Sequence, residues 1–221
     1  MPVGIYASWD IETVPNERAE EIIDQQVFDP PANYKDPEKI KAHLAEAKRK
    51  AYDRAALNWW TGQIVSIAVS PPGEPSFVVC SDDESHLVRA FFDYVLGYPD
   101  LDLVGKSSDY FDTPFLIGRA LALDLGLPLF LRRHHRGTIT DVDQIFSFSA
   151  SCDQRSNLAN YAFGLGIEGK SGSGCQVAEW FQRAVLGEKE YFKRIADYNV
   201  QDTLIVLEMM KRFQKPYLTG G

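Results

Sequence analysis

Long apolar segments are missing from this sequence. No apolar run approaches the ~20 residues needed to cross a bilayer, and the first residues, MPVGIYASWD, lack the basic start and the cleavage site of a secretory signal. The chain has three cysteines, Cys80, Cys152 and Cys175, which are too few and too widely spaced for a disulfide framework or a zinc knuckle. We therefore expect a cytoplasmic protein that does not interact with a membrane.

An excess of basic residues is also missing. The chain has 23 Lys and Arg against 31 Asp and Glu, which gives a net charge of −8. This charge disfavours non-specific coating of nucleic acid, but it leaves room for a local site in which metal ions lie between carboxylates and phosphates. With 221 residues, 45% of them hydrophobic, the composition is typical of a globular protein with about one domain. We therefore predict a single domain over residues 1–221.

The apolar pattern alternates between strand and helix periodicity. It predicts strands at residues 3–9, 64–69, 77–80, 101–105 and 138–140. Helices are predicted after a Ser81–Glu84 capping box, after the Thr113 cap and over most of the chain beyond residue 157. Between the first two strands, residues 15–60 form a helical insertion whose main helix, about 30 Å long, begins near Asp36. This order predicts an α/β fold with a mixed central sheet flanked by helices.

Two carboxylates follow the first predicted strand. Asp10 and Glu12 are two residues apart, so they project from the same face of an extended chain. Carboxylates at the carboxyl end of a strand suit a hard cation such as Mg²⁺. The alternative is a solvated strand end.

Two further segments place acidic side chains near the same edge. Asp112 follows the strand at residues 101–105, and the carboxyl ends of parallel strands meet at one rim of a sheet. Its alternative role is to stabilise a helix N-terminus. Tyr198 and Asp202 are four apart on a late helix and share one face. Because an apolar run follows, Asp202 needs a partner such as a metal ion, unless it lies on the solvent side.

Three motifs, taken together, indicate a family. SWDIET, GKSSDYFDTPFL and YNVQD, in this order, resemble the DEDD superfamily of DnaQ-like 3′–5′ exonucleases, which have an RNase H-like fold. The Tyr-x-x-x-Asp form of the last motif is similar to the tyrosine subgroup (DEDDy). Within it, the chain looks most like the stand-alone exonucleases related to the proofreading domain of family B DNA polymerases. The resemblance extends from residue 9 to about residue 210.

The resemblance implies an activity and its cofactors. We expect a metal-dependent 3′–5′ exonuclease that hydrolyses single-stranded DNA to 5′-mononucleotides with two Mg²⁺ or Mn²⁺ ions. The implied metal ligands are Asp10, Glu12, Asp112 and Asp202, with Asp10 shared by both ions. Tyr198 would orient the attacking water. A role in replication or repair would need a polymerase or another replication protein as a partner in trans.

The resemblance also suggests contacts to substrate, with one departure. The family usually has an Asn five residues before the Asp of the second motif, whereas this chain has Ser107, so the grip on substrate is expected to differ. The expected substrate contacts are Ile11, Thr13, Ser107, Phe111, Arg132, Arg133 and Arg136. The three arginines lie in a basic cluster that either contacts phosphates or forms a solvated loop. Alternative functions are a catalytically weak or inactive RNase H-like nucleic-acid-binding module and a 3′–5′ exoribonuclease.

Four other residues have open roles. Asp141 and Asp143 are spare carboxylates near the expected rim and are alternative metal ligands. Trp59 and Trp60 precede a strand and either stack on bases or belong to the core. The lysines of the insertion are interspersed with glutamates, which favours an ordinary exposed face.

Overall fold

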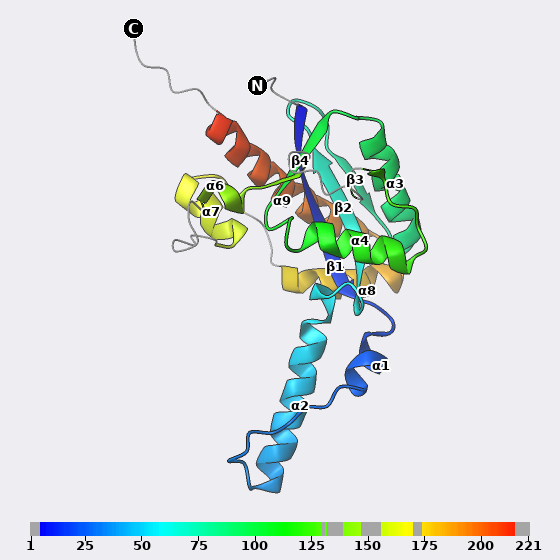
Figure 1. Cartoon of the computed structure of the whole chain (residues 1–221), viewed down its shortest axis with the longest axis vertical. Helices are drawn as coiled ribbons and strands as arrows, with labels where there is room; N and C mark the ends of the chain where they lie inside the picture. Colours follow the sequence, from blue (N-terminus) through cyan, green and yellow to red (C-terminus); the bar gives the residue numbers. More distant parts are fainter. Residues whose placement is uncertain (1–4, 130, 132–138, 147–155, 170–173, 215–221) are drawn as a thin grey trace.

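A five-stranded mixed sheet forms the centre of the molecule (Figure 1). The computed structural model describes residues 5–129, 131, 139–146, 156–169 and 174–214. The strands are β1 (Ile5–Pro15), β2 (Gly62–Ser70), β3 (Phe77–Cys80), β4 (Leu101–Gly105) and β5 (Ile139–Asp141). Their order is β3-β2-β1-β4-β5, in which β1 is antiparallel to β2 and parallel to β4. The β2–β3 pair is antiparallel and the β4–β5 pair is parallel.

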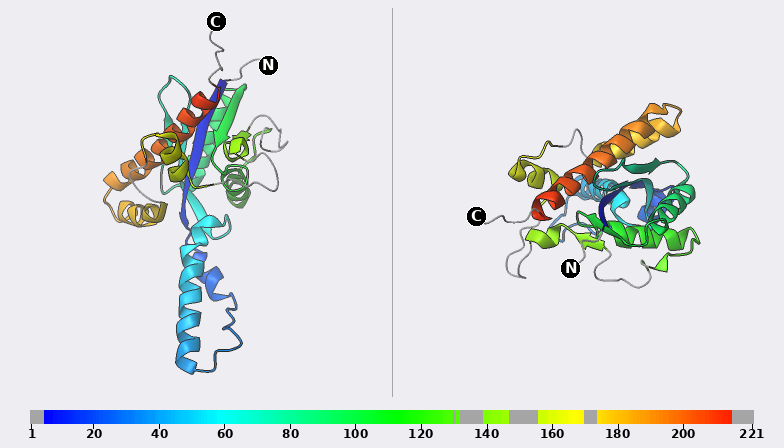
Figure 2. Two further views of the ribbon diagram at one scale, coloured as in Figure 1. Left: turned by 90° about the vertical axis from the view of Figure 1, so that its left-hand side faces the viewer. Right: turned by 90° about the horizontal axis from the view of Figure 1, so that it is seen from above.

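Helices cover both faces of this sheet (Figure 2). The α-helices are α1 (Ala19–Asp24), α2 (Pro37–Asp53), α3 (Glu84–Leu96), α4 (Asp112–Ala122), α6 (Asp143–Phe146), α7 (Leu158–Leu165), α8 (Val177–Val185) and α9 (Glu190–Gln214). Short 3₁₀ turns lie at η1 (Ala55–Leu57) and η2 (Gly174–Gln176). Helices α3 and α4 pack on β2 from one side, while α9 crosses β1 and β2 on the other and carries α8 and α7.

The largest hydrophobic cluster lies between the sheet and α3 and α4. Trp9 of β1 is fully buried and stacks on Phe91 of α3, with ring centroids 5.5 Å apart. Leu87 and Val88 from the same helix face are also completely buried there. Burial of such side chains contributes about 1.5–3 kcal/mol each, so this face anchors β1, the strand that carries the first motif.

Strand β1 is longer than the pattern predicted. It continues to Pro15, because β2 pairs with it all the way from Ser8 to Pro15. On the other side, β4 pairs with β1 only up to Ser8. The second half of β1 therefore has a strand neighbour on one side alone.

The start of α3 also differs from the expected capping box. Asp83, not Ser81, caps the helix and accepts a hydrogen bond from the His86 N–H at 3.0 Å. Glu84 is buried instead of facing the cap. It forms an ion pair with Arg119 at 2.6 Å and accepts the N–H of Ile64 at 2.7 Å. The long-range ion pair outcompetes the local cap because it also satisfies a backbone donor of β2.

Helix α4 begins earlier than predicted. The sequence suggested Thr113 as the cap, but the helix already includes Asp112 and ends at Ala122. Thr113 is buried inside the first turn, where its N–H binds the Ser108 carbonyl at 2.9 Å.

The insertion between β1 and β2 forms an arm that projects from the body (Figure 1). Helix α2 starts at Pro37, with Asp36 as its cap, and ends at Asp53, followed by the η1 turn. The α/β fold with a mixed sheet, flanking helices and a helical insertion is confirmed, and it is consistent with an RNase H-like fold. Within the described residues, no helix combines the length and the apolar character needed to cross a membrane.

Candidate metal centre

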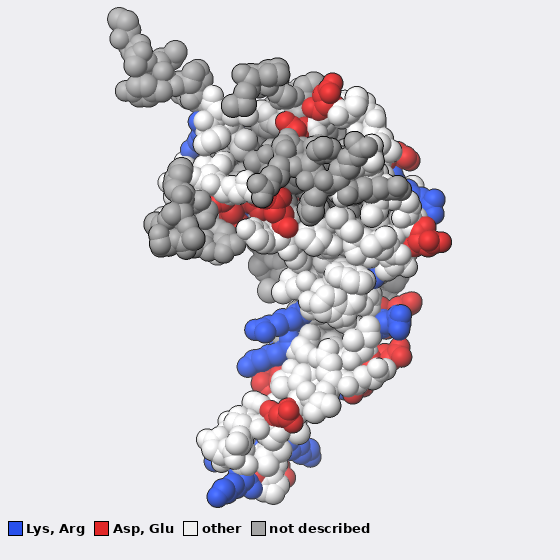
Figure 3. Space-filling view, in the orientation of Figure 1, with Lys and Arg blue, Asp and Glu red and all other residues white. Residues whose placement is uncertain are grey.

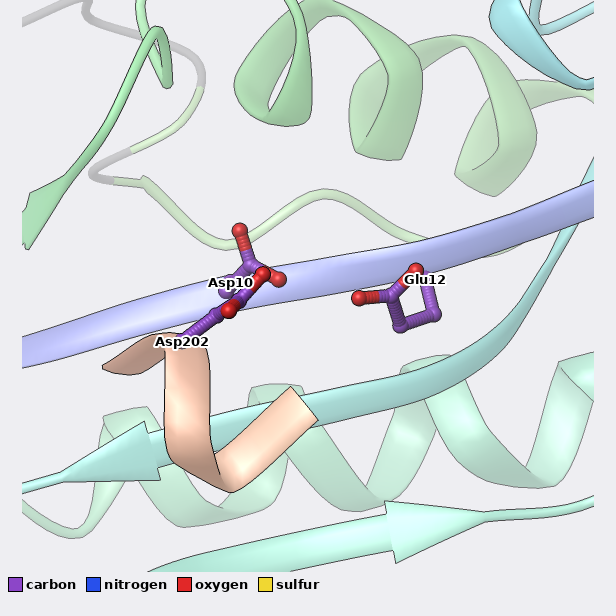
Figure 4. A group of neighbouring side chains, drawn as sticks. All are labelled: Asp10, Glu12 and Asp202. Carbon is purple, nitrogen blue, oxygen red and sulfur yellow. The ribbon is translucent and has the colours of Figure 1, made fainter. Parts of the chain in front are cut away.

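Three carboxylates converge beside the open half of β1. Asp10 and Glu12 come from β1 and Asp202 comes from α9, and one oxygen of each lies within 4.8 Å of the others (Figure 4). Glu12 is 9% exposed and Asp202 is 6% exposed, while Asp10 is half-buried. Carboxylates held this close repel one another unless a cation lies between them, so the group could hold a divalent metal ion.

The geometry of β1 brings the first two carboxylates together. Asp10 and Glu12 are alternate residues of an extended strand, so they share a face. The sequence pattern predicted that both residues follow the end of the strand. In the structure they lie within β1. The neighbouring strand β4 ends at Gly105, where a Cβ atom would lie 2.5 Å from the Ser108 side chain and 3.2 Å from Trp9 Nε1. Glycine at this position lets the chain turn away close to β1.

Buried hydroxyl groups fix α9 against the sheet next to Asp202. The Ser8 hydroxyl donates to the Thr203 carbonyl at 2.6 Å. The Thr203 and Ser70 hydroxyl groups are also 2.6 Å apart. These contacts join β1, β2 and α9, so the helix cannot slide without breaking them. Sequence reasoning missed them because each pairs residues far apart in the chain.

A fourth polar residue contacts the group. Asn199 is completely buried on α9, and its side-chain amide donates to Asp10 Oδ2 at 3.4 Å. It lies inside the YNVQD motif, three residues before Asp202 and therefore on the same helix face. That spacing was the signal that could have identified it.

Asp112 lies beside the group without belonging to it. It is 2% exposed at the start of α4 and accepts a hydrogen bond from the backbone N–H of Ile11. Burial, followed by the charge of Asp141, raises the pKa of Asp112 to about 8. Its Oδ2 atom is buried and has no hydrogen-bond partner among the described residues. A cation next to this oxygen would supply the missing partner, so the residues fit a metal.

Tyr198 shares the buried face of α9 with Asp202, one turn away. It is almost fully buried, and its ring meets Trp180 of α8 edge to face, with centroids 6.1 Å apart. Val14 of β1 and Val65 of β2 belong to the same cluster. The ring therefore packs between α9 and residues of β1, β2 and α8.

The residues that were expected to contact substrate lie in different surroundings. The Ile11 side chain is buried in the core, and the Thr13 hydroxyl donates to the Ala56 carbonyl at 2.7 Å. Phe111 is half-buried and packs on Phe115, with centroids 5.4 Å apart. Ser107 lies in the turn before α4, considered below. The basic cluster of Arg132, Arg133 and Arg136 falls outside the described residues.

Asp141 and Asp143 hold the turn between β4 and α4. Asp141 accepts the N–H groups of Ser107 and Asp143 at 3.0 and 2.9 Å. Asp143 accepts the hydroxyl groups of Tyr161 and Ser107, both at 2.9 Å. Among the described residues, neither belongs to the three-carboxylate group. Their hydrogen bonds explain why buried carboxylates are tolerated there.

The two tryptophans at the base of the arm are not core residues. Trp59 is 40% exposed and Trp60 is 49% exposed, and their rings meet edge to face. They line a cavity of about 840 Å³ together with Asn16 and Arg119. On the arm itself, Lys48 pairs with Asp24 and Arg49 pairs with Glu46 at the surface, as expected for a solvated face.

The fold and the acidic group define an α/β protein with a cluster of carboxylates, on β1 and α9, that could hold a metal ion. Among solved structures, the chain is similar to the family B DNA polymerase from the hyperthermophilic archaeon Pyrobaculum calidifontis, with a TM-score of 0.56 and 18% sequence identity. The similarity covers 96% of this chain and 25% of the polymerase, so the chain spans about a quarter of that protein. At this identity the likeness concerns the fold alone. No family model matches the sequence. No curated protein matches it either.

Proposed function

We propose that the protein is a metal-dependent 3′–5′ exonuclease of the DEDDy type that hydrolyses single-stranded DNA to 5′-mononucleotides in the cytoplasm. The observation that carries this proposal is the convergence of Asp10, Glu12 and Asp202 within 4.8 Å. The three sequence motifs and the likeness to a family B DNA polymerase support it. In replication or repair, the exonuclease would act together with a polymerase or another replication protein.

The residues divide the work of holding two divalent ions. Asp10, Glu12 and Asp202 would hold the first ion, and Asp10 and Asp112 would hold the second. When bound, Mg²⁺ or Mn²⁺ ions supply activation of a water molecule and neutralisation of phosphate charge. This neutralisation reconciles a net charge of −8 with a polyanionic substrate.

The protein groups around the ions orient the reactants. Asn199 fixes the rotamer of Asp10 by its hydrogen bond to Oδ2. Tyr198 directs its hydroxyl group toward the attacking water, with its ring fixed by Trp180. Fixed positions of this kind lower the activation barrier because the groups need no reorganisation during the reaction.

One incubation separates the proposal from its alternatives. Single-stranded DNA and RNA of the same sequence, labelled at the 5′ end, are incubated with the protein and Mg²⁺ or Mn²⁺. We expect a ladder of DNA shortened from the 3′ end and release of 5′-mononucleotides. Faster shortening of RNA would identify an exoribonuclease. Binding of DNA without shortening would identify an inactive nucleic-acid-binding module.

Metal ions are expected to stabilise the fold. Because the carboxylates are assembled only in the folded chain, Mn²⁺ at about 100 times its dissociation constant should raise the free energy of unfolding by about 2.7 kcal/mol. This corresponds to a rise in melting temperature of about 5–10 °C for a chain of this size. The measurement is a thermal melt with EDTA and with Mn²⁺. Asp10→Asn should lose most of the increment.

The matched control for this melt is Asp197→Asn. Asp197 lies on α9 as Asp202 does, but it is exposed and pairs with Lys193 at 2.6 Å. This variant should keep the full metal-dependent shift. An equal shift in Asp10→Asn would show that the carboxylates do not bind the ion.

A further inference from the structure

Lys106 lies at the first position after β4, in the turn that leads to Asp112. Its ammonium donates a hydrogen bond to the Ser107 hydroxyl at 2.6 Å. It also lies 3.4 Å from Asp143 Oδ2. The side chain is 19% exposed, so it reaches the surface while its ammonium contacts Ser107 and Asp143.

The groups that hold this ammonium are themselves fixed. Asp143 is nearly fully buried and is bound by the Tyr161 hydroxyl at 2.9 Å. Ser107 has a left-handed backbone with φ of 60°, and its N–H binds Asp141 at 3.0 Å. A non-glycine residue adopts this conformation only where its surroundings maintain it. The network therefore positions the ammonium and does not leave it to sample solvent freely.

Counting donors distinguishes Ser107 from Lys106. The Ser107 hydroxyl has one proton, and it donates that proton to Asp143 at 2.9 Å. Ser107 therefore has no proton to offer a substrate. A lysine ammonium has three N–H donors, and the two contacts above use two of them. Within the part of the chain that the structure describes, one donor of Lys106 is left.

The surroundings of the remaining Lys106 donor are acidic. Acidic side chains gather on the body between α7 and α4 (Figure 3). Lys106 is close enough to Asp112 for its positive charge to lower the pKa of that carboxyl, against the effects of burial and Asp141. A phosphate approaching this rim would meet the remaining N–H of Lys106.

We propose that Lys106 is a substrate-contacting residue whose ammonium donates to a phosphate oxygen of the nucleotide at the site. This inference rests on the proposed function, since it concerns the same site. The competing role is structural, in which Lys106 only neutralises the buried charge of Asp143. The two roles differ in what happens when Asp143 is neutralised by other means.

The first experiment compares Lys106→Met with Lys193→Met, which removes the same charge from an exposed position on α9. Losing one charge-assisted hydrogen bond should raise KM for single-stranded DNA about tenfold, with kcat changed by less than about threefold. Inhibition by a 5′-mononucleotide should weaken by about the same factor, while inhibition by the nucleoside, which has no phosphate, stays constant. Lys193→Met should behave as wild type. Unchanged inhibition by the nucleotide in Lys106→Met would overturn the proposal.

The second experiment adds Asp143→Asn to Lys106→Met. In the double variant the buried charge of Asp143 is gone and no longer needs the ammonium, so the melting temperature should return toward that of the wild type. KM and the nucleotide inhibition constant should remain raised, because the phosphate contact is still missing. Recovery of both constants together with stability would show a structural role only.

The failure of this inference can be told from failure of the proposed function. If wild type shortens neither DNA nor RNA, the nuclease proposal fails. Calorimetric titration of 5′-mononucleotide into wild type and Lys106→Met, with Ca²⁺ present, still tests the phosphate contact. Equal affinities in the two proteins would reject the role of Lys106 by itself.

Discussion

Asp10→Asn and Asp202→Asn are expected to lower the rate of nucleotide release by about three orders of magnitude or more. Each substitution keeps the shape of the side chain but removes the negative charge that holds a divalent ion. The fold should persist, because the core around Trp9 and Phe91 is untouched. Indeed, removing one of three mutually repelling carboxylates should stabilise the metal-free protein. The measurement is kcat on labelled single-stranded DNA at saturating Mn²⁺, with circular dichroism to verify folding.

The same substitution at Asp197 provides the control for this result. Asp197 is on α9, exposed, and paired with Lys193, so Asp197→Asn should retain full activity. Wild-type activity in folded Asp10→Asn would mean that the acidic group is not the catalytic centre. An equal loss in Asp197→Asn would mean that the loss reflects the helix and not the site.

Tyr198→Phe should reduce kcat by about ten- to a thousandfold, the range of effects of a group that positions or polarises a reactant. The substitution removes only the hydroxyl group, so the edge-to-face contact with Trp180 should be retained. Because Tyr198 does not hold an ion in this proposal, the metal-dependent rise in melting temperature should be unchanged. Both kcat and the thermal shift are measured on the same preparation.

Tyr191→Phe is the matched control for the loss of a hydroxyl. Tyr191 is a buried tyrosine of the same helix, and the guanidinium groups of Arg183 and Arg194 lie 4.2 and 4.7 Å from its ring centroid. We expect its activity to equal that of wild type. If Tyr198→Phe is as active as Tyr191→Phe, Tyr198 serves packing alone.

Local sequence patterns predicted the elements better than their ends. The alternation in the first motif identifies a strand, but it does not indicate how far a neighbouring strand extends the pairing. The continuation of β1 to Pro15 was therefore missed. The Glu84 side chain was assigned to a local cap because its partner, Arg119, is distant in the chain. Propensity arguments concern neighbours in sequence, whereas a buried ion pair depends on the tertiary fold.

In the candidate site, too, local patterns could be predicted from the sequence and long-range contacts could not. Asp10, Glu12, Asp112 and Asp202 were expected to meet because of the resemblance of their three motifs to a known family. The structure brings Asp10, Glu12 and Asp202 together. The roles of Asp141 and Asp143 could not be decided, since their hydrogen bonds to the turn at Ser107 depend on how β5 pairs with β4. The assignment of the expected ligands to catalysis stays a prediction until the variants above are measured.

The arm has a small hydrophobic cluster of its own, separate from the clusters that line the sheet. It consists of Ala19, Ile23 and Ala55, with Phe28 and Ala51 packed against them. Because this cluster contains few apolar groups, it stabilises the arm less than the larger clusters stabilise the sheet. The arm can therefore open while the rest of the molecule stays folded. Amide protons of α2 should therefore exchange with solvent through this local opening, whereas those of β1 exchange only when the sheet itself unfolds. The arm and the sheet are in this sense two cooperative units of different stability within one chain.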